Sequence, residues 1–137
     1  MIEREVEHRV EVGGVMVPFV EGDVGVRHLG YWIDLHGDWG NQQARVEAII
    51  DDFTAKVRPA KLSRGMILYL VSAVLIPRVM YPLTVAGLHS AVVERLEGKV
   101  LGWLLRKLGL HKTYPRRLVN APREMGGLGW ESWTVRV

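Results

Sequence analysis

Hydrophobic and polar residues alternate through the first third of the chain. Valines alternate with other residues on both sides of Gly13-Gly14, and a glycine pair supplies the positive φ angles that a two-residue hairpin turn requires. A second strand-like stretch runs from Val24 to Leu35 and closes at His36-Gly37-Asp38. The pattern predicts a β-rich region, with a hairpin between Glu3 and Phe19.

After Trp39 the apolar residues recur every three or four positions. This period predicts a helix from about residue 40 to residue 58, which Pro59 ends. Ser63 is a suitable N-cap for a second helix over residues 66 to 81, which is apolar nearly all round and is expected to be the core helix. Pro77 is expected to kink or end this helix, because proline lacks the N–H that the helical ladder uses.

A third helix is predicted from about Ser90 to Leu108. Its leucines and valines gather on one side of the helical wheel, which predicts a packing face. The other side carries a basic stripe, which consists of Arg95, Lys99 and Arg106. Beyond Gly109 the chain is predicted to form a brief helix that starts at Pro115, and then a glycine-hinged turn at residues 126 to 130 before a terminal strand or coil.

Composition narrows the class of protein. With 137 residues, of which 48% are hydrophobic, the chain can bury one ordinary core. The absence of cysteine excludes disulfides, thiolate zinc sites and cysteine nucleophiles. Met1 to Glu11 has no apolar segment typical of a secretory signal, and the most apolar run, Met66 to Ile76, is shorter than the roughly 20 residues of a membrane-spanning helix. We expect a soluble, intracellular protein without a membrane contact.

Charge is distributed unevenly along the chain. Residues 1 to 62 hold seven Lys and Arg against eleven Asp and Glu, a net charge of −4, whereas residues 63 to 137 hold eleven against four, a net charge of +7. A one-sided basic field attracts polyanions over about a Debye length, roughly 8 Å at physiological salt. The C-terminal half therefore favours a nucleic-acid partner, with an acidic protein surface as the alternative.

Four stretches carry motifs in a fixed order. They are Arg-His-Leu-Gly-Tyr-Trp-Ile at residues 27 to 33, Ala-Val-Leu-Ile-Pro-Arg-Val-Met-Tyr at 73 to 81, a leucine-repeat helix over 92 to 110, and Met-Gly-Gly-Leu-Gly-Trp at 125 to 130. Over about residues 24 to 133, their order and spacing resemble the C-terminal part of the polymerase domain in non-LTR (LINE-type) retrotransposon reverse transcriptases.

The resemblance implies a mainly α, α+β fold that forms one compact unit. Residues 1 to 38 would be the primer-grip strands at the end of the palm, and residues 39 to 137 a three-helix thumb with a Gly-rich C-terminal turn or strand. It also implies that the chain holds an RNA or RNA/DNA duplex. The implied contact residues are His28, Leu29, Gly30 and Tyr31 of the primer-grip hairpin, the basic stripe, and the basic region that continues through Lys107, Lys112, Arg116 and Arg117.

The resemblance does not include the catalytic centre of the family. That centre needs an adjacent aspartate pair and an upstream aspartate, which together hold two Mg²⁺ ions, and this block should precede Val24. Asp51-Asp52 is the one adjacent acidic pair, but it lies in a helical period after the primer grip, where a solvated helix face is expected. We therefore expect no polymerase activity from this chain alone, and no metal or cofactor.

Several alternatives remain open at this level. A basic stripe on an amphipathic helix can be its solvated face, and Gly30 can be an ordinary strand bulge. The chain can also be a retroelement fragment that serves as a scaffold in a ribonucleoprotein, or one piece of a split reverse transcriptase. Because the palm is missing, we expect a protein partner or self-association to cover the surface it would occupy.

Overall fold

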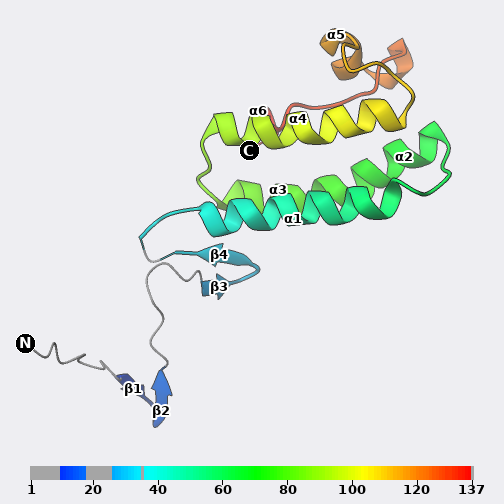
Figure 1. Ribbon diagram of the computed structural model, residues 1–137. Helices are drawn as coiled ribbons and strands as arrows, with labels where there is room; N and C mark the ends of the chain where they lie inside the picture. Colours follow the sequence, from blue (N-terminus) through cyan, green and yellow to red (C-terminus); the bar gives the residue numbers. More distant parts are fainter. Residues whose placement is uncertain (1–9, 18–25, 35, 137) are drawn as a thin grey trace, which may run out of the picture.

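The computed structural model describes residues 10–17, 26–34 and 36–136, and it shows a mixed α+β chain (Figure 1). The first hairpin pairs β1 (Val10–Val12) with β2 (Val15–Val17) in antiparallel register, and Gly13 and Gly14 have φ angles of 60° and 78°. The predicted hairpin is confirmed over these residues, and the rest of its predicted range lies outside the described residues. All its strand residues are exposed, and the expected protein partner stays a prediction.

A second hairpin lies where the alternation predicted one continuous strand. β3 (Val26–His28) and β4 (Tyr31–Ile33) are antiparallel, with His28 opposite Tyr31. The turn consists of Leu29, with a φ of 47°, and Gly30, with a φ of 90°. Period-two alternation missed this turn because leucine rarely takes the left-handed position that the turn requires. The hairpin that the family resemblance implied is present; Val24 and Leu35 lie outside the described residues.

The helices begin where the sequence period predicted them. α1 (Gly40–Val57) is followed by one continuous helical run that comprises α2 (Arg64–Leu70), the π-helical turn η1 (Val71–Leu75) and α3 (Ile76–Val85). Ser63 is the predicted N-cap, since its hydroxyl accepts a hydrogen bond from the Met66 N–H at 3.3 Å. We call this run from Arg64 to Val85 the long helix.

Pro77 does not end the long helix, so this part of the prediction is wrong. The turn before it widens to a π-helix, in which the Ile76 N–H donates to the Val71 carbonyl five residues back. A wider turn gives the proline ring room near the preceding carbonyls, which is a common way for a helix to tolerate an interior proline. The helix therefore continues through Pro82 to Val85.

The long helix extends well beyond the apolar run Met66 to Ile76. By length and composition alone, Arg64–Val85, with 22 residues, is long and apolar enough to cross a membrane, and 33% of its most apolar window is buried in the protein. Its buried residues include Ile67, Val71, Leu75 and Val79. These recur every four residues on one face, as expected of a helix that packs against a core.

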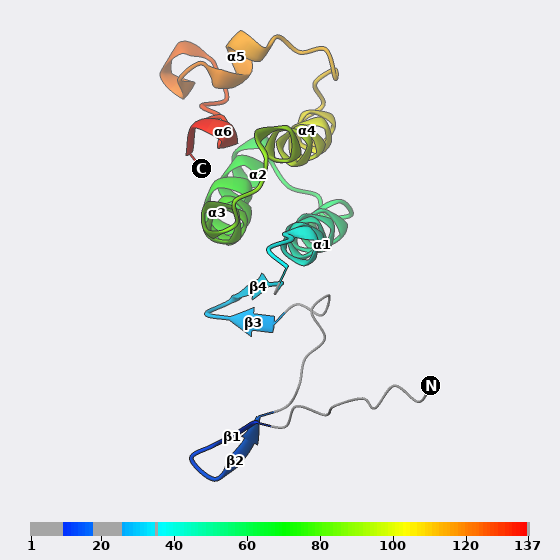
Figure 2. The same ribbon diagram turned by 90° about the vertical axis from the view of Figure 1, so that its left-hand side faces the viewer.

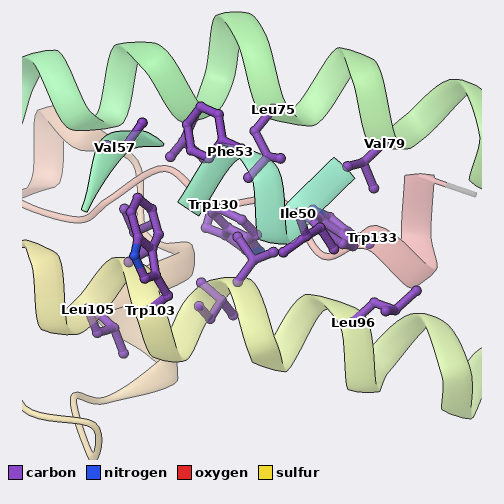
Figure 3. Packing of buried hydrophobic residues seen from close by; sticks show 14 of the residues in the cluster. Ile50, Phe53, Val57, Leu75, Val79, Leu96, Trp103, Leu105, Trp130 and Trp133 are labelled. Carbon is purple, nitrogen blue, oxygen red and sulfur yellow. The ribbon is translucent and has the colours of Figure 1, made fainter. Parts of the chain in front are cut away.

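Three helices enclose the core. α4 (Ser90–Lys107) runs parallel to α1, and the long helix runs antiparallel to both (Figures 1 and 2). Figure 3 shows the contact layer between them, in which the Phe53 and Trp103 rings meet edge to face with centroids 5.9 Å apart. Trp103, which the wheel placed between the apolar face and the basic stripe, is thus a core residue with 7% exposure.

The C-terminal segment folds back over the bundle. α5 (Arg116–Asn120) and the 3-10 turn η2 (Arg123–Met125) are followed by α6 (Trp133–Arg136), so the predicted terminal strand or coil is wrong. α6 packs against α3 and α4, and Trp133 is fully buried. The burial of Trp133 explains why four residues hold a helical turn that would be unstable in isolation.

Candidate nucleic-acid interface

The basic stripe of α4 is largely neutralised by α1. The Arg95 guanidinium lies 2.5 Å from a Glu47 carboxylate oxygen, and the Lys99 ammonium lies 2.8 Å from Asp51. The hydrogen bond from Arg95 lowers the pKa of the Glu47 carboxyl below its ordinary value. The expectation that Arg95 and Lys99 present free cations to a phosphate backbone is therefore corrected, because each has a carboxylate partner one helix away.

The helical wheel of α4 alone could not reveal these ion pairs, because the acidic partners lie on α1. Because α1 and α4 run parallel, residues one turn apart on α1 meet residues one turn apart on α4, and the two ion pairs form in register. Asp51 and Asp52 each pair with a lysine, Lys99 and Lys56, and no described residues form a group of His, Cys, Asp or Glu that could hold a metal ion. The acidic pair is an exposed face that carries ion pairs.

Lys107 has a structural role. Its ammonium donates to the carbonyl oxygens of Arg58 and Ala60, at 2.7 and 2.8 Å, and so caps the C-terminal end of α1. Carbonyls at a helix end carry partial negative charge and have no intrahelical donor, and Lys107 satisfies that of the C-cap Arg58 together with that of Ala60 in the connection beyond it. Lys107 is half-buried and joins α4 to the end of α1; its expected phosphate contact stays a prediction.

The remaining predicted bases are exposed and have no carboxylate partner among the described residues. They are Arg106, Lys112, Arg116 and Arg117, and we call them the distal bases. Arg106 donates from Nε to the Gly102 carbonyl of its own helix at 3.1 Å. Residues 98 to 123 contain no Asp or Glu, so the positive field here has no acid from the same segment to cancel it.

The hairpin turn of the second predicted site is fixed by the long helix. The Tyr81 hydroxyl donates to the Leu29 carbonyl at 2.7 Å, and a Cβ on Gly30 would lie 3.6 Å from the Tyr81 ring. Two separate sequence motifs, the Leu-Gly turn and the tyrosine that follows Pro77, therefore meet in space. The Leu29 side chain is 75% exposed, and its left-handed backbone costs roughly 1–2 kcal/mol.

His28 and Tyr31 flank this turn, with their rings edge to face and the centroids 5.9 Å apart. The hairpin thus brings together the residues that the resemblance implied, His28, Leu29, Gly30 and Tyr31, on a short ladder in which β3 is exposed and β4 is half-buried. Two-stranded hairpins of this size are marginal in water, so anchors to the bundle decide its position.

Gln42, which the sequence did not single out, is the second anchor. Its side chain is fully buried, and its Oε1 accepts the Trp32 N–H at 2.8 Å while its Nε2 donates to the Pro82 carbonyl at 3.4 Å. Its bonds join β4, α1 and α3 in one place. A polar residue in the first turn of a predicted helix gives no signal of burial, so only the packing of three elements reveals this role.

Replacing Tyr81 by phenylalanine is expected to free the hairpin turn with little effect on the bundle. One hydrogen bond at a half-exposed site stabilises the fold by about 1 kcal/mol, and amide hydrogen exchange should report lost protection in β3 and β4. Tyr69→Phe is the matched control, because Tyr69 lies exposed on the same helix and should change stability by less than about 0.5 kcal/mol. Equal exchange rates in Tyr81→Phe and the parent protein would contradict the anchoring role.

Two shallow cavities, of about 260 and 300 Å³, lie where the long helix meets the C-terminal segment, and Arg136 lines both. Arg136 is paired with Glu131 at 2.8 Å. Ser72 and Ile76 also line both cavities, and Arg123 and Glu131 line the smaller one.

No protein-family model matches the chain, and no curated protein or solved structure is significantly similar to it.

Proposed function

We propose that this chain is a nucleic-acid-binding module that corresponds to the primer grip and thumb of a reverse transcriptase. It holds an RNA or RNA/DNA duplex by the sugar-phosphate backbone and has no polymerase activity of its own. The observation that supports this most directly is the group of distal bases, which are exposed and lack carboxylate partners among the described residues. The order of the sequence motifs supports the resemblance to the reverse-transcriptase family.

The physical reason is counterion release. Duplex nucleic acid carries condensed cations, and Lys or Arg side chains that neutralise phosphates release them, so affinity falls steeply with salt. Such contacts fix position without reading bases, which suits a clamp on a newly formed duplex. The paired residues Arg95 and Lys99 would have to break ion pairs first, so the distal bases supply most of the binding energy in this proposal.

The hairpin gives a second contact at the other end of the bundle. Gln42 and Tyr81 anchor it at the start of α1 and the end of α3, whereas the distal bases begin near the end of α4. α1 has 18 residues, and at about 1.5 Å per residue it is about 27 Å long. A duplex that contacts both ends must therefore extend over at least about 27 Å, the length of α1.

Charge removal at the distal bases tests the proposal. The triple change Arg106→Gln, Arg116→Gln and Arg117→Gln is expected to weaken binding of a 20-base-pair RNA/DNA duplex by about 10- to 100-fold. It should also reduce the slope of log affinity against log salt by about 2 to 3. Fluorescence anisotropy at several salt concentrations measures both quantities.

The matched control removes three charges that are already paired, through Lys56→Gln, Arg95→Gln and Lys99→Gln. This variant has the same net charge as the test variant but should bind within about threefold of the parent protein, because its cations are neutralised by α1. Equal losses in both variants would show that binding depends on net charge and not on the distal bases. Absence of binding by the parent protein at low salt would refute the function.

A further inference from the structure

We propose that the α1–α2 connection supplies a second set of phosphate contacts, through Arg58, Lys61 and Arg64, which we call the connection bases. They lie next to the loop between α4 and α5, so that two loops from different parts of the chain contact one nucleic-acid backbone. This inference rests on the proposed function, and it adds residues that neither the sequence motifs nor the helical wheel indicated.

The structure brings the two loops together through specific contacts. The Lys107 ammonium at the end of α4 bonds the carbonyls of Arg58 and Ala60 at the end of α1. On the other side of the same junction, the Arg64 guanidinium lies 3.8 Å from the position that a Cβ on Gly109 would take. Gly109 begins the α4–α5 loop. The connection bases therefore stand at the end of the bundle where the distal bases begin.

The electrostatic environment differs sharply along the α1–α4 seam. In its middle, Lys56, Arg95 and Lys99 each have an acidic partner within 3.0 Å. At its end, where α1 and α4 both finish, the chain supplies no nearby acid in sequence, because neither residues 53 to 93 nor residues 98 to 123 contain Asp or Glu. None of the connection bases forms an ion pair with a described residue. They are all exposed. Several cations in one place without a counter-charge raise the local positive potential and favour a bound polyanion.

The spread of these charges points to an extended ligand. The connection bases and distal bases lie on two loops and the helix ends beside them, and none of them lines either of the two described cavities. Arginine forms two-pronged hydrogen bonds with phosphate oxygens, whereas lysine acts as a point charge. A sugar-phosphate backbone, with regularly repeated charges, matches this surface better than one free phosphate does.

The test is a double variant, Lys61→Gln with Arg64→Gln, against the control Lys56→Gln with Lys99→Gln. The double variant is expected to bind the same 20-base-pair duplex about tenfold more weakly, with a salt slope lower by about 2, while the control stays within about twofold. Lys61→Gln alone should show about half of the change in slope. Thermal melting verifies that each variant is folded.

The outcomes separate this inference from the proposed function. If the parent protein binds the duplex and the double variant binds equally well with an unchanged slope, the connection bases play no part and the inference fails alone. If the parent protein does not bind, both fail. Displacement of the duplex by poly-glutamate of equal charge, at the same concentration as by single-stranded RNA, would overturn the inference in favour of an acidic protein partner.

Discussion

Replacing Gly127 by alanine is expected to destabilise the protein by roughly 3–5 kcal/mol, the range of severe core disruptions. A Cβ at this position would lie 2.0 Å from the Ala121 carbonyl oxygen and 2.4 Å from its carbon. Backbone atoms cannot move aside as a flexible side chain can. The fold-back after α5 would therefore have to separate, which chemical denaturation followed by tryptophan fluorescence would detect.

The fold-back is held by backbone hydrogen bonds between residues 129–130 and the end of α5. The Gly129 N–H donates to Ala121 at 2.8 Å, and the Trp130 N–H donates to Val119 at 3.0 Å. Gly126→Ala is the matched control: its φ of 83° makes alanine strained, but no atom lies within 4 Å of the new Cβ, so a loss of about 1–2 kcal/mol is expected. If the two variants lose the same stability, the close approach of Gly127 is not what holds the segment.

Gly127→Ala is also expected to affect duplex binding. Arg116 and Arg117 lie on α5, which the fold-back fixes against the bundle, whereas Arg106 is on α4. Gly127→Ala should therefore weaken duplex binding although every distal base is still present. We therefore expect the Met-Gly-Gly-Leu-Gly-Trp motif to support the basic surface structurally.

Replacing Trp133 by alanine is expected to cost about 3–5 kcal/mol of unfolding free energy, as for other fully buried tryptophans. Its side chain has 0% exposure and stacks near Trp130, with ring centroids 6.0 Å apart. Figure 3 shows it beside Ile50 in the centre of the cluster. Because α6 consists of four residues, it should lose its helical turn with the indole, and circular dichroism with urea denaturation would measure both effects.

Phenylalanine substitutions separate the packing of the two tryptophans from their hydrogen bonds. The Trp130 Nε1–H donates to the buried Glu97 carboxylate at 2.8 Å, whereas the Trp133 Nε1–H has no partner among the described residues. Trp130→Phe leaves a buried carboxylate without its donor, but Trp133→Phe removes an unsatisfied donor that costs about 1–3 kcal/mol. Trp130→Phe should therefore be the more destabilising change, and the opposite order would contradict this assignment of the hydrogen bonds.

Local sequence patterns predicted the helices and the first hairpin of this protein. The period of α1, the N-cap at Ser63 and the paired glycines of the first hairpin all act within a few residues, so the sequence predicts them without knowledge of the fold. The excess of bases in the C-terminal half is also a property of the sequence alone. The same local reasoning missed the turn at Leu29, because a left-handed leucine is uncommon and its carbonyl is fixed by Tyr81, which is 52 residues away.

Only the tertiary structure decided which bases are available to a ligand. The wheel of α4 grouped Arg95, Lys99 and Arg106 correctly on one side, but the parallel register of α1 neutralises the first two and leaves the third exposed. The tertiary structure also places the Lys107 ammonium on carbonyls at the end of α1 and brings Arg64 beside Gly109. Charge neutralisation depends on separations of a few ångströms between helices, and a one-dimensional pattern holds no such distances.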